Sequence, residues 1–418
     1  MKILKRWRRS KLMLALAVIG PGIIVGNADN DPSGIYGYSV AGASYGYGML
    51  WMLALIIISL YVIQEMCARM AIATGKGLAD LIREEFGIKI ALLAMVTLFI
   101  ANFSTTISEF AGISAAVGLL FKPGIHRFLM PLLTFVIWII VMRGSYRGVE
   151  RILLAASFIY LSYVVTAVMA HPNWQEVSRS FVTPHVKMSS DYMRVAISLI
   201  GTTITPWGLF FIQSSIRDKG ISARHYRYVR MDIIAGSIFV GFIAACILIA
   251  CAATLHPKGI YLGMNANAAD AAKALAPFVG RWASTLFAIG VLNAGMFGAI
   301  VVPLSTAYAI TESLGWESGL GRRIREAPLF AGVYGVLIFL SALVVIVSNP
   351  DNLGFLIQLP NIVGCILLPI ILVLALKLVN NKEIMGNYVN TRWANVITWS
   401  TAIVIITLSI ALAVLTFI

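Results

Sequence analysis

The residues with the clearest capacity for chemistry form one polar segment, Asn27-Ala28-Asp29-Asn30-Asp31-Pro32-Ser33-Gly34, inside a long apolar stretch. Pro32 has no amide hydrogen and disfavours helical geometry at Asp31, while Ser33-Gly34 permits an extended turn. A helix should therefore unwind here and leave main-chain carbonyl oxygens free beside the Asp31 carboxylate. Such hard oxygen ligands suit a cation. A helix cap at a membrane surface is the ordinary alternative for such an aspartate, but Asp31 lies well inside its apolar segment.

A second break of the same kind is Gly201-Thr202-Thr203-Ile204-Thr205-Pro206-Trp207-Gly208. Here proline and glycine interrupt an apolar helix, and three threonines supply hydroxyls that can bond to the backbone groups released. On its own, Pro206 is also compatible with a simple kink. Together with the first break, it predicts two discontinuous helices that share one site.

The elements that must position these residues are membrane spans. Of the 418 residues, 59% are hydrophobic and only 12% are charged, which is too apolar for a water-facing surface. A span needs roughly 20 apolar residues, and none of the apolar runs alternates with the period of a barrel strand. Eleven such runs predict helices at 12–30, 48–72, 91–120, 128–143, 150–170, 191–215, 230–254, 282–310, 328–348, 352–377 and 393–416.

The expected fold is therefore all-α and polytopic, with eleven transmembrane helices in a single transporter domain, 1–418. The two breaks fall in the first and sixth spans, five spans apart. This spacing predicts two five-helix repeats of inverted topology, as in LeuT-like transporters, with the substrate site at their interface near the middle of the membrane. The first repeat would cover 12–170, the second 191–377, and helix 393–416 would lie outside both.

The formal net charge of +14 follows the membrane topology and does not indicate a nucleic-acid partner. Of the 32 lysines and arginines, 23 fall in the terminal segment and alternate loops on the amino-terminal side. This is the positive-inside pattern, which predicts a plasma-membrane protein with a cytoplasmic amino terminus and an extracytoplasmic carboxyl terminus. The basic segment Met1–Lys11 also fits the start of a signal peptide, but no small-residue cleavage site follows it. The four cysteines, which lie in or beside spans, are expected to be small core residues.

At the first break, the chain resembles the natural resistance-associated macrophage protein (Nramp) family of divalent-metal transporters, whose first helix carries Asp-Pro-Gly-Asn. The resemblance covers most of residues 10–380. It includes three further segments, which are Gln64-Glu65-Met66-Cys67-Ala68-Arg69-Met70-Ala71-Ile72-Ala73-Thr74-Gly75, Asp232-Ile233-Ile234, and Ala276-Pro277-x-x-Gly280 followed by Thr285-Leu286-Phe287-Ala288-Ile289.

The resemblance implies a set of metal ligands. The family's carboxylate ligand corresponds to Asp31, and its main-chain carbonyl ligands correspond to Ala28 and Thr202. Two side-chain ligands differ, because Gly34 stands for the family's asparagine and Thr205 for its methionine. Loss of a soft thioether removes the selection against hard ions, and glycine is expected to leave a wider site. Because Mg²⁺ usually keeps several waters, we expect partly hydrated Mg²⁺ as cargo, with Mn²⁺ also accepted, as in the Nramp-related magnesium transporter branch.

Proton coupling is not expected. The family's third-helix aspartate corresponds to Thr106 and its sixth-helix histidine to Trp207, neither of which serves as a proton relay, although Glu109 remains nearby. The five histidines fall in predicted loops and are His126, His171, His185, His225 and His256. An inside-negative potential alone favours entry of a divalent ion, by about 2.3 kcal/mol per charge per 100 mV.

Three further polar residues at membrane depth are expected to bind the hydration shell of the ion or to line its path, namely Glu109, Gln64 and Asn361. For Asn361, helix-to-helix bridging is the default alternative. The other functions considered are a proton-coupled Mn²⁺/Fe²⁺ symporter and, more distantly, a sodium-coupled amino-acid carrier. An enzyme is not expected, because the sequence has no nucleophile-base set, and neither is a resident cofactor. The expected partners are the metal substrate and the lipid bilayer, and a monomer suffices for transport.

Overall fold

The structure is a computed structural model that describes residues 20–121, 124–187, 189–263, 266 and 268–417. The basic segment Met1–Lys11 and the predicted start of the first span, residues 12–19, lie outside the described residues.

The first span consists of two helices, as the sequence predicts. Helix α3 (Pro21–Ala28) is separated from α4 (Pro32–Tyr45) by Asp29, Asn30 and Asp31, and the backbone at Asp31 is extended, with φ −72° and ψ 171°. Pro32 begins α4 because its fixed φ and missing amide suit the first position of a helix. The break therefore lies where the Asp-Pro pair predicts it.

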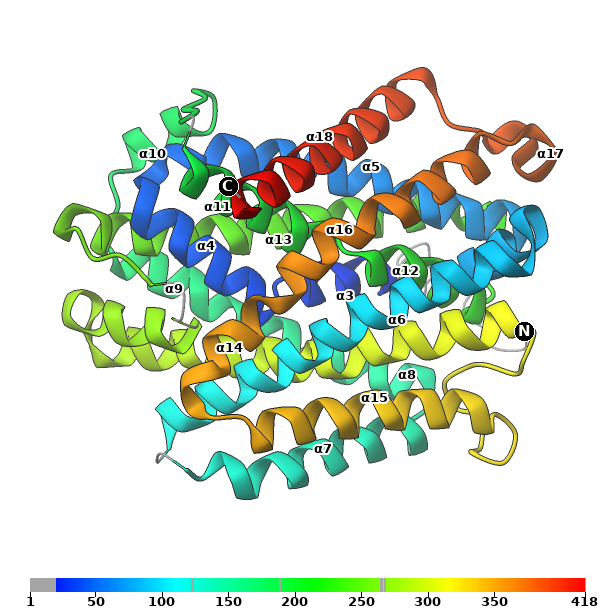
Figure 1. Cartoon of the computed structure of the whole chain (residues 1–418), viewed down its shortest axis with the longest axis horizontal. Helices are drawn as coiled ribbons and strands as arrows, with labels where there is room; N and C mark the ends of the chain where they lie inside the picture. The colour runs from blue at the N-terminus through cyan, green and yellow to red at the C-terminus, as the bar shows by residue number, and fades with distance from the viewer. Residues whose placement is uncertain (1–19, 122–123, 188, 264–265, 267, 418) are drawn as a thin grey trace, which may run out of the picture.

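The sixth span is also discontinuous. Helix α11 (Ser190–Thr203) ends before α12 (Pro206–Asp218), and the two residues between them, Ile204 and Thr205, are extended. Again a proline occupies the first turn of the second half-helix. Figure 1 shows α3 and α12 near the middle of the molecule, with α7 and α18 at opposite edges.

The remaining predicted spans coincide with helices, and the described residues contain no strand. Eight described segments are long and apolar enough to cross a membrane, and α16 and α18 contribute shorter apolar stretches. The helices are α5 (Leu50–Thr74), α6 (Leu78–Leu120), α7 (His126–Arg143), α8 (Tyr146–Ala156) with α9 (Leu161–Met169), α13 (Tyr226–Thr254), α14 (Ala268–Leu314), α15 (Pro328–Val347), α16 (Leu353–Asn380) and α18 (Arg392–Phe417), together with the short α10 (Trp174–Ser180) and α17 (Lys382–Met385).

Two helices begin earlier than the sequence predicts. Helix α6 starts at Leu78 and α14 at Ala268, and each contains one left-handed glycine, Gly87 (φ 79°) in α6 and Gly280 (φ 83°) in α14. The residues before each glycine are too polar or too small to register as part of a span. The two helices, which are the predicted third and eighth spans, pack extensively against each other. Each of these two helices therefore has a bent extension at its amino-terminal end, and the two helices are five spans apart in the sequence.

The broken first span is held against α13 by close backbone contact. A Cβ added to Gly236 would lie 2.2 Å from the carbonyl oxygen of Gly22, and one added to Gly26 would lie 2.5 Å from the carbonyl oxygen of Gly236. Asp232, one turn earlier in α13, accepts hydrogen bonds from the amides of Gly20 and Gly22 at 3.1 and 2.6 Å. These amides lie at the start of α3, where they have no intrahelical partner.

Replacing Gly236 by alanine is expected to destabilise the protein, because the new methyl group has no space between α13 and α3. Overpacking of this kind costs about 1–3 kcal/mol. We expect a lower melting temperature in detergent and less monodisperse protein. The matched control is Gly332→Ala in α15, where an added Cβ meets nothing within 4 Å. Equal melting temperatures for the two variants would contradict this account of the packing.

Candidate functional site

The carboxylate of Asp31 lies at the meeting point of the two breaks. Its Oδ1 accepts hydrogen bonds from the Gly34 amide at 2.6 Å and from the Thr202 hydroxyl at 3.1 Å. The Ser33 hydroxyl lies 2.8 Å from both carboxylate oxygens. Asp31 therefore caps α4 and at the same time joins the first span to the sixth.

A second carboxylate, Asp29, joins the breaks on the other side. Its Oδ1 accepts a hydrogen bond from the Thr205 hydroxyl at 3.1 Å, and its Oδ2 accepts one from Nε2 of Gln64 in α5 at 3.2 Å. Both carboxylates are buried, with 1% of Asp29 and 5% of Asp31 exposed. In this conformation the site is closed to solvent.

The four helix ends around these carboxylates favour a cation. Ala28 and Thr202 lie in the last turns of α3 and α11, where a helix runs out of amide donors for its main-chain carbonyls. The positive ends of α4 and α12 also point here, but Asp31 accepts from the Gly34 amide of α4, and Asp29 approaches the first turn of α12 through Thr205. The two carboxylates thus occupy the amino-terminal helix ends at which an anionic substrate would bind. The net negative charge that they bring favours a cation instead.

Asn361 reaches this site through a hydroxyl of the first break. Its Oδ1 lies 3.2 Å from the Ser33 hydroxyl, and its Nδ2 donates to the Ser198 hydroxyl of α11 at 2.9 Å. The structure thus places Asn361 beside the site, where it bridges α4 to α11, which is the alternative that the sequence leaves open for this residue. Ser33 and Ser198 were not predicted as site residues, although Ser198 lies one helical turn before Thr202 and therefore on the same face.

Glu109 lies near the first break without contacting Asp31. Its side chain is fully buried, and neither carboxylate oxygen has a hydrogen-bond partner among the described residues. It fills the space beside Gly298 of α14, where an added Cβ would lie 2.0 Å from Oε1. One turn later, a Cβ at Gly112 would lie 2.3 Å from the Pro32 ring, so α6 packs directly against the break. An uncompensated buried carboxylate in this position is a candidate functional group.

Thr106 and Trp207, the two residues on which the expectation of uncoupled transport rests, are engaged structurally. The Thr106 hydroxyl donates to the carbonyl of Asn102 in its own helix at 2.7 Å. Trp207 is buried, and its carbonyl accepts a hydrogen bond from the Ser305 hydroxyl at 2.8 Å. Among the described residues, no group of three or more histidine, cysteine, aspartate or glutamate side chains could hold a metal ion. The donors at the site are therefore carboxylate, hydroxyl, amide and carbonyl groups.

The wider site that Gly34 leads us to expect is absent from this conformation. A Cβ at position 34 would lie 2.8 Å from the Thr202 hydroxyl and 3.1 Å from Oδ1 of Asp31. The Thr202 side chain, which reaches across from the sixth span, fills the volume that a larger residue at 34 would take. Position 34 and position 202 therefore have to be considered together.

The end of α12 that points away from the breaks is tied to α6 and α14 by ion pairs. Arg217 lies 3.1 Å from Asp80 of α6 and 2.9 Å from the fully buried Glu312 of α14. Its guanidinium also donates to the Ser318 hydroxyl at 2.9 Å. These contacts fix the carboxyl end of α12 against α6 and α14.

Comparisons with known proteins agree with this architecture. The family model described as natural resistance-associated macrophage protein-like matches residues 22–415. A curated protein named divalent metal cation transporter MntH, from Deinococcus radiodurans, is 28% identical over 408 residues, which is 94% of this chain and 88% of that protein. A protein of the same name from Staphylococcus aureus is 26% identical over 433 residues, with 98% and 93% of the two chains covered.

Among solved structures, the Eremococcus coleocola manganese transporter superposes with a TM-score of 0.78 at 21% identity and covers 96% of this chain and 87% of its own. Mhp1, a nucleobase-cation-symport-1 family transporter, superposes with a TM-score of 0.56 at 15% identity, covering 95% of this chain and 91% of its own. At these identities the likeness concerns the fold alone, and it confirms the predicted all-α transporter fold.

Proposed function

The chain belongs to the natural resistance-associated macrophage protein family, and we propose that it carries divalent metal cations across a membrane by alternating access, with Mg²⁺ as preferred cargo and Mn²⁺ also accepted. The relatives reported above are transporters, so the chain is a transporter and not an enzyme, and metal is its cargo and not a resident cofactor. The observation that carries the proposal is the buried Asp31 carboxylate between the two broken spans.

In this proposal the ligands are the carboxylate of Asp31, the main-chain carbonyls of Ala28 and Thr202, and water or hydroxyl oxygen near Gly34 and Thr205. The Thr202 and Ser33 hydroxyls that now donate to Asp31 rotate to present their lone pairs when an ion binds. Hydroxyls can do this at little cost because each carries both a donor and acceptor lone pairs. The site seen here is thus held together by hydrogen bonds that a cation replaces.

The preference for a hard ion rests on the donor types. Thr205 supplies a hydroxyl directed at Asp29 where the family has a methionine, so no thioether favours softer ions. Mg²⁺ binds oxygen and releases its waters reluctantly. Three polar side chains are suited to hold such waters. Asn361 bonds to the Ser33 hydroxyl and Gln64 to the Asp29 carboxylate. Glu109 lies one turn before the point at which α6 packs against Pro32. Mn²⁺ also accepts oxygen ligands, and the solved neighbour is named as a manganese transporter.

We further propose that the membrane arrangement follows the two repeats, 12–170 and 191–377, with 393–416 outside them. The paired breaks and the paired bends at Gly87 and Gly280 support this division. The excess of basic residues on the amino-terminal side supports a cytoplasmic amino terminus in the plasma membrane. The proposed ligands come from the two breaks of a single chain, and we propose that a monomer is sufficient for transport.

The second candidate is a proton-coupled Mn²⁺/Fe²⁺ symporter, and one observation favours it. Glu109 is a buried carboxylate without a hydrogen-bond partner among the described residues, close to the break. A carboxylate in that state can take up a proton. Against this reading, Thr106 and Trp207 supply no further step along which a proton would leave.

Mg²⁺ uptake into proteoliposomes is expected to occur without acidification of the lumen, because Thr106 and Trp207 cannot pass on a proton from Glu109 and neither Glu109 oxygen has a hydrogen-bond partner among the described residues. The measurement uses a Mg²⁺ indicator and a pH dye in the same vesicles, with an inside-negative potential and then with Mn²⁺ in place of Mg²⁺. Asp31→Ala vesicles supply the baseline for leak. Acidification that requires the metal, and that disappears in Glu109→Gln, would establish the symporter instead.

A further inference from the structure

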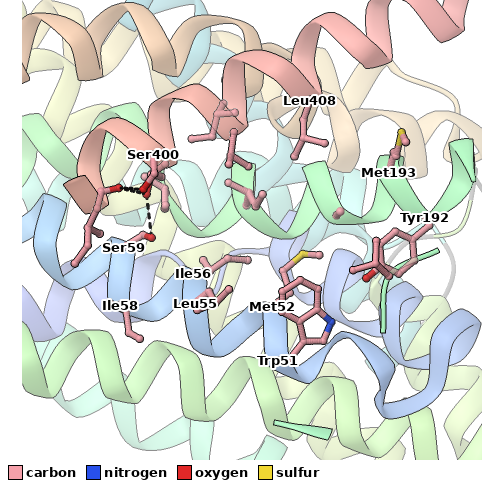
Figure 2. Close-up of a pocket in the computed structure, with 18 of the residues that line it drawn as sticks. Trp51, Met52, Leu55, Ile56, Ile58, Ser59, Tyr192, Met193, Ser400 and Leu408 are labelled. Carbon is pink, nitrogen blue, oxygen red and sulfur yellow. Dashed lines mark hydrogen bonds between the residues drawn. The ribbon is translucent and has the colours of Figure 1, made fainter. Parts of the chain in front are cut away.

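An apolar groove of about 510 Å³ lies between α5, α11 and α18 and is lined by none of the proposed metal ligands. Figure 2 shows its walls, with Trp51 and Tyr192 at one end and Ser59 and Ser400 at the other. Between these ends the lining side chains are almost all aliphatic, including Met52, Leu55 and Leu408. The volume is that of a site for a small molecule or a single hydrocarbon chain.

The groove has the depth of one membrane leaflet. On α11 it extends from Tyr192 to Ile204, which at 1.5 Å per residue is about 18 Å. Half of the hydrocarbon core is about 15 Å. Because α5, α11 and α18 all belong to predicted spans, the groove opens into hydrocarbon and not into water. An acyl chain of one leaflet can therefore enter it from the side.

The two ends of the groove differ in charge, since the far end carries only uncharged hydroxyls, of which Thr401 donates to Ser59 at 3.0 Å. At one end, Lys187 is exposed and is the one charged side chain among the described lining residues. Its ammonium lies 5.6 Å from the centre of the Tyr45 ring, which holds it near this mouth. Trp51 and Tyr192 are the amphipathic aromatic residues typical of a membrane interface. The positive charge at the mouth complements a phosphate headgroup.

The deep end of the groove reaches the back of the metal site. Ile200 and Ile204 line it, and Ile204 is the extended residue between Thr203 and Thr205 at which the sixth span breaks. A molecule in the groove therefore packs against the same stretch of backbone that carries Thr202 and Thr205, whose hydroxyls bond to Asp31 and Asp29.

We propose that this groove binds one acyl chain of an anionic phospholipid, with the phosphate paired to Lys187 and the end of the chain against Ile204. The lipid thereby supports the break of the sixth span from behind. The proposal does not depend on which ion is carried, because the groove shares no residue with the ligands of the metal.

The test uses Trp51, whose indole lines the groove, as a contact reporter. The protein is reconstituted in phosphatidylglycerol or phosphatidylcholine with brominated acyl chains, which quench tryptophan fluorescence on contact. The contribution of Trp51 is the difference between the wild type and Trp51→Phe. We expect it to be quenched more strongly in phosphatidylglycerol, and Lys187→Glu to reduce the quenching to the phosphatidylcholine level.

Filling the groove distinguishes a bound chain from bulk lipid. Ala196→Phe in α11, or Ser400→Phe in α18 if the first variant does not fold, should abolish the Trp51 quenching in phosphatidylglycerol. Val165→Phe on the exposed face of α9 is the matched control and should leave it unchanged. Equal quenching in both lipids, or quenching that survives in the filled variants, would overturn the proposal and leave only contact with bulk lipid.

Discussion

Replacing Asp31 by alanine is expected to abolish divalent-cation flux while the protein stays folded. The carboxylate of Asp31 accepts hydrogen bonds from the Ser33 hydroxyl of the first break and the Thr202 hydroxyl of the sixth span. Loss of a partner outside the first ligand shell typically costs about 10–100-fold in metal affinity, so loss of the charged ligand itself should cost more. The measurements are Mg²⁺ and Mn²⁺ uptake into proteoliposomes and binding by calorimetry.

Asp31→Asn separates the metal-binding role from the structural one. Asp31 also caps α4 by accepting from the Gly34 amide, and alanine would remove that cap at a cost of about 1 kcal/mol. Asparagine keeps an oxygen that accepts this hydrogen bond but loses the charge. We therefore expect Asp31→Asn to melt close to the wild type and to transport as poorly as the alanine variant.

Asp29→Asn is the matched control at the second carboxylate. Asp29 is engaged by Thr205 and Gln64, and an amide can preserve one of these contacts. We expect a partial loss of flux. If Asp29→Asn eliminates transport while a monodisperse Asp31→Asn still transports, the cation binds at Asp29 and the central assignment is wrong.

The sequence predicts the breaks because their causes are local. Pro32 and Pro206 act on their immediate neighbours, and a carboxylate beside Pro32 in an apolar stretch has few explanations other than a site. The early starts of α6 and α14 were missed because the residues before Gly87 and Gly280 do not resemble a membrane span. A hydropathy scan detects contact with lipid and not helix length.

Contacts between distant segments could not be predicted in the same way. Ser198 joins the site only because α16 places Asn361 between it and Ser33. The expectation of a wide site at Gly34 failed for the same reason, since the side chain that fills the volume comes from Thr202, in another span. A glycine in the sequence therefore does not by itself predict a cavity, because a side chain from another span can fill the space.

The largest change in selectivity is expected from three substitutions together, Gly34→Asn, Thr202→Ala and Thr205→Met. The backbone at Gly34 is not in the left-handed region, so asparagine meets only a steric barrier there. The closest atom is the Thr202 hydroxyl, 2.8 Å from the new Cβ, which alanine at 202 removes, and Oδ1 of Asp31 at 3.1 Å remains a tight contact. Without Thr202→Ala, asparagine at 34 would displace the Thr202 side chain and shift the carboxylate of Asp31.

With room provided, the triple variant gains one direct amide oxygen and one soft thioether. Thioether ligands favour Cd²⁺ and the later transition metals, so we expect Cd²⁺ affinity to rise at least about tenfold, which corresponds to about 1.4 kcal/mol. Mg²⁺ transport should be lost, because the added side chains take the space of its retained waters. Binding of Cd²⁺ and Mn²⁺ is measured by calorimetry, and uptake of Mg²⁺ in proteoliposomes.

The matched control is Thr202→Ala alone, which opens the site without adding a ligand. If the absence of soft donors sets the preference for Mg²⁺, this variant, which loses the Thr202 hydroxyl but keeps its main-chain carbonyl, should transport Mg²⁺ at a reduced rate and gain no Cd²⁺ affinity. The Gly34→Asn and Thr205→Met double variant should fold less well than the triple variant, because its asparagine and Thr202 compete for one volume. Undiminished Mg²⁺ transport by a folded triple variant with unchanged Cd²⁺ affinity would show that positions 34 and 205 do not set selectivity. The magnesium proposal would then lose its physical basis, whereas transport of divalent cations through Asp31 would still stand.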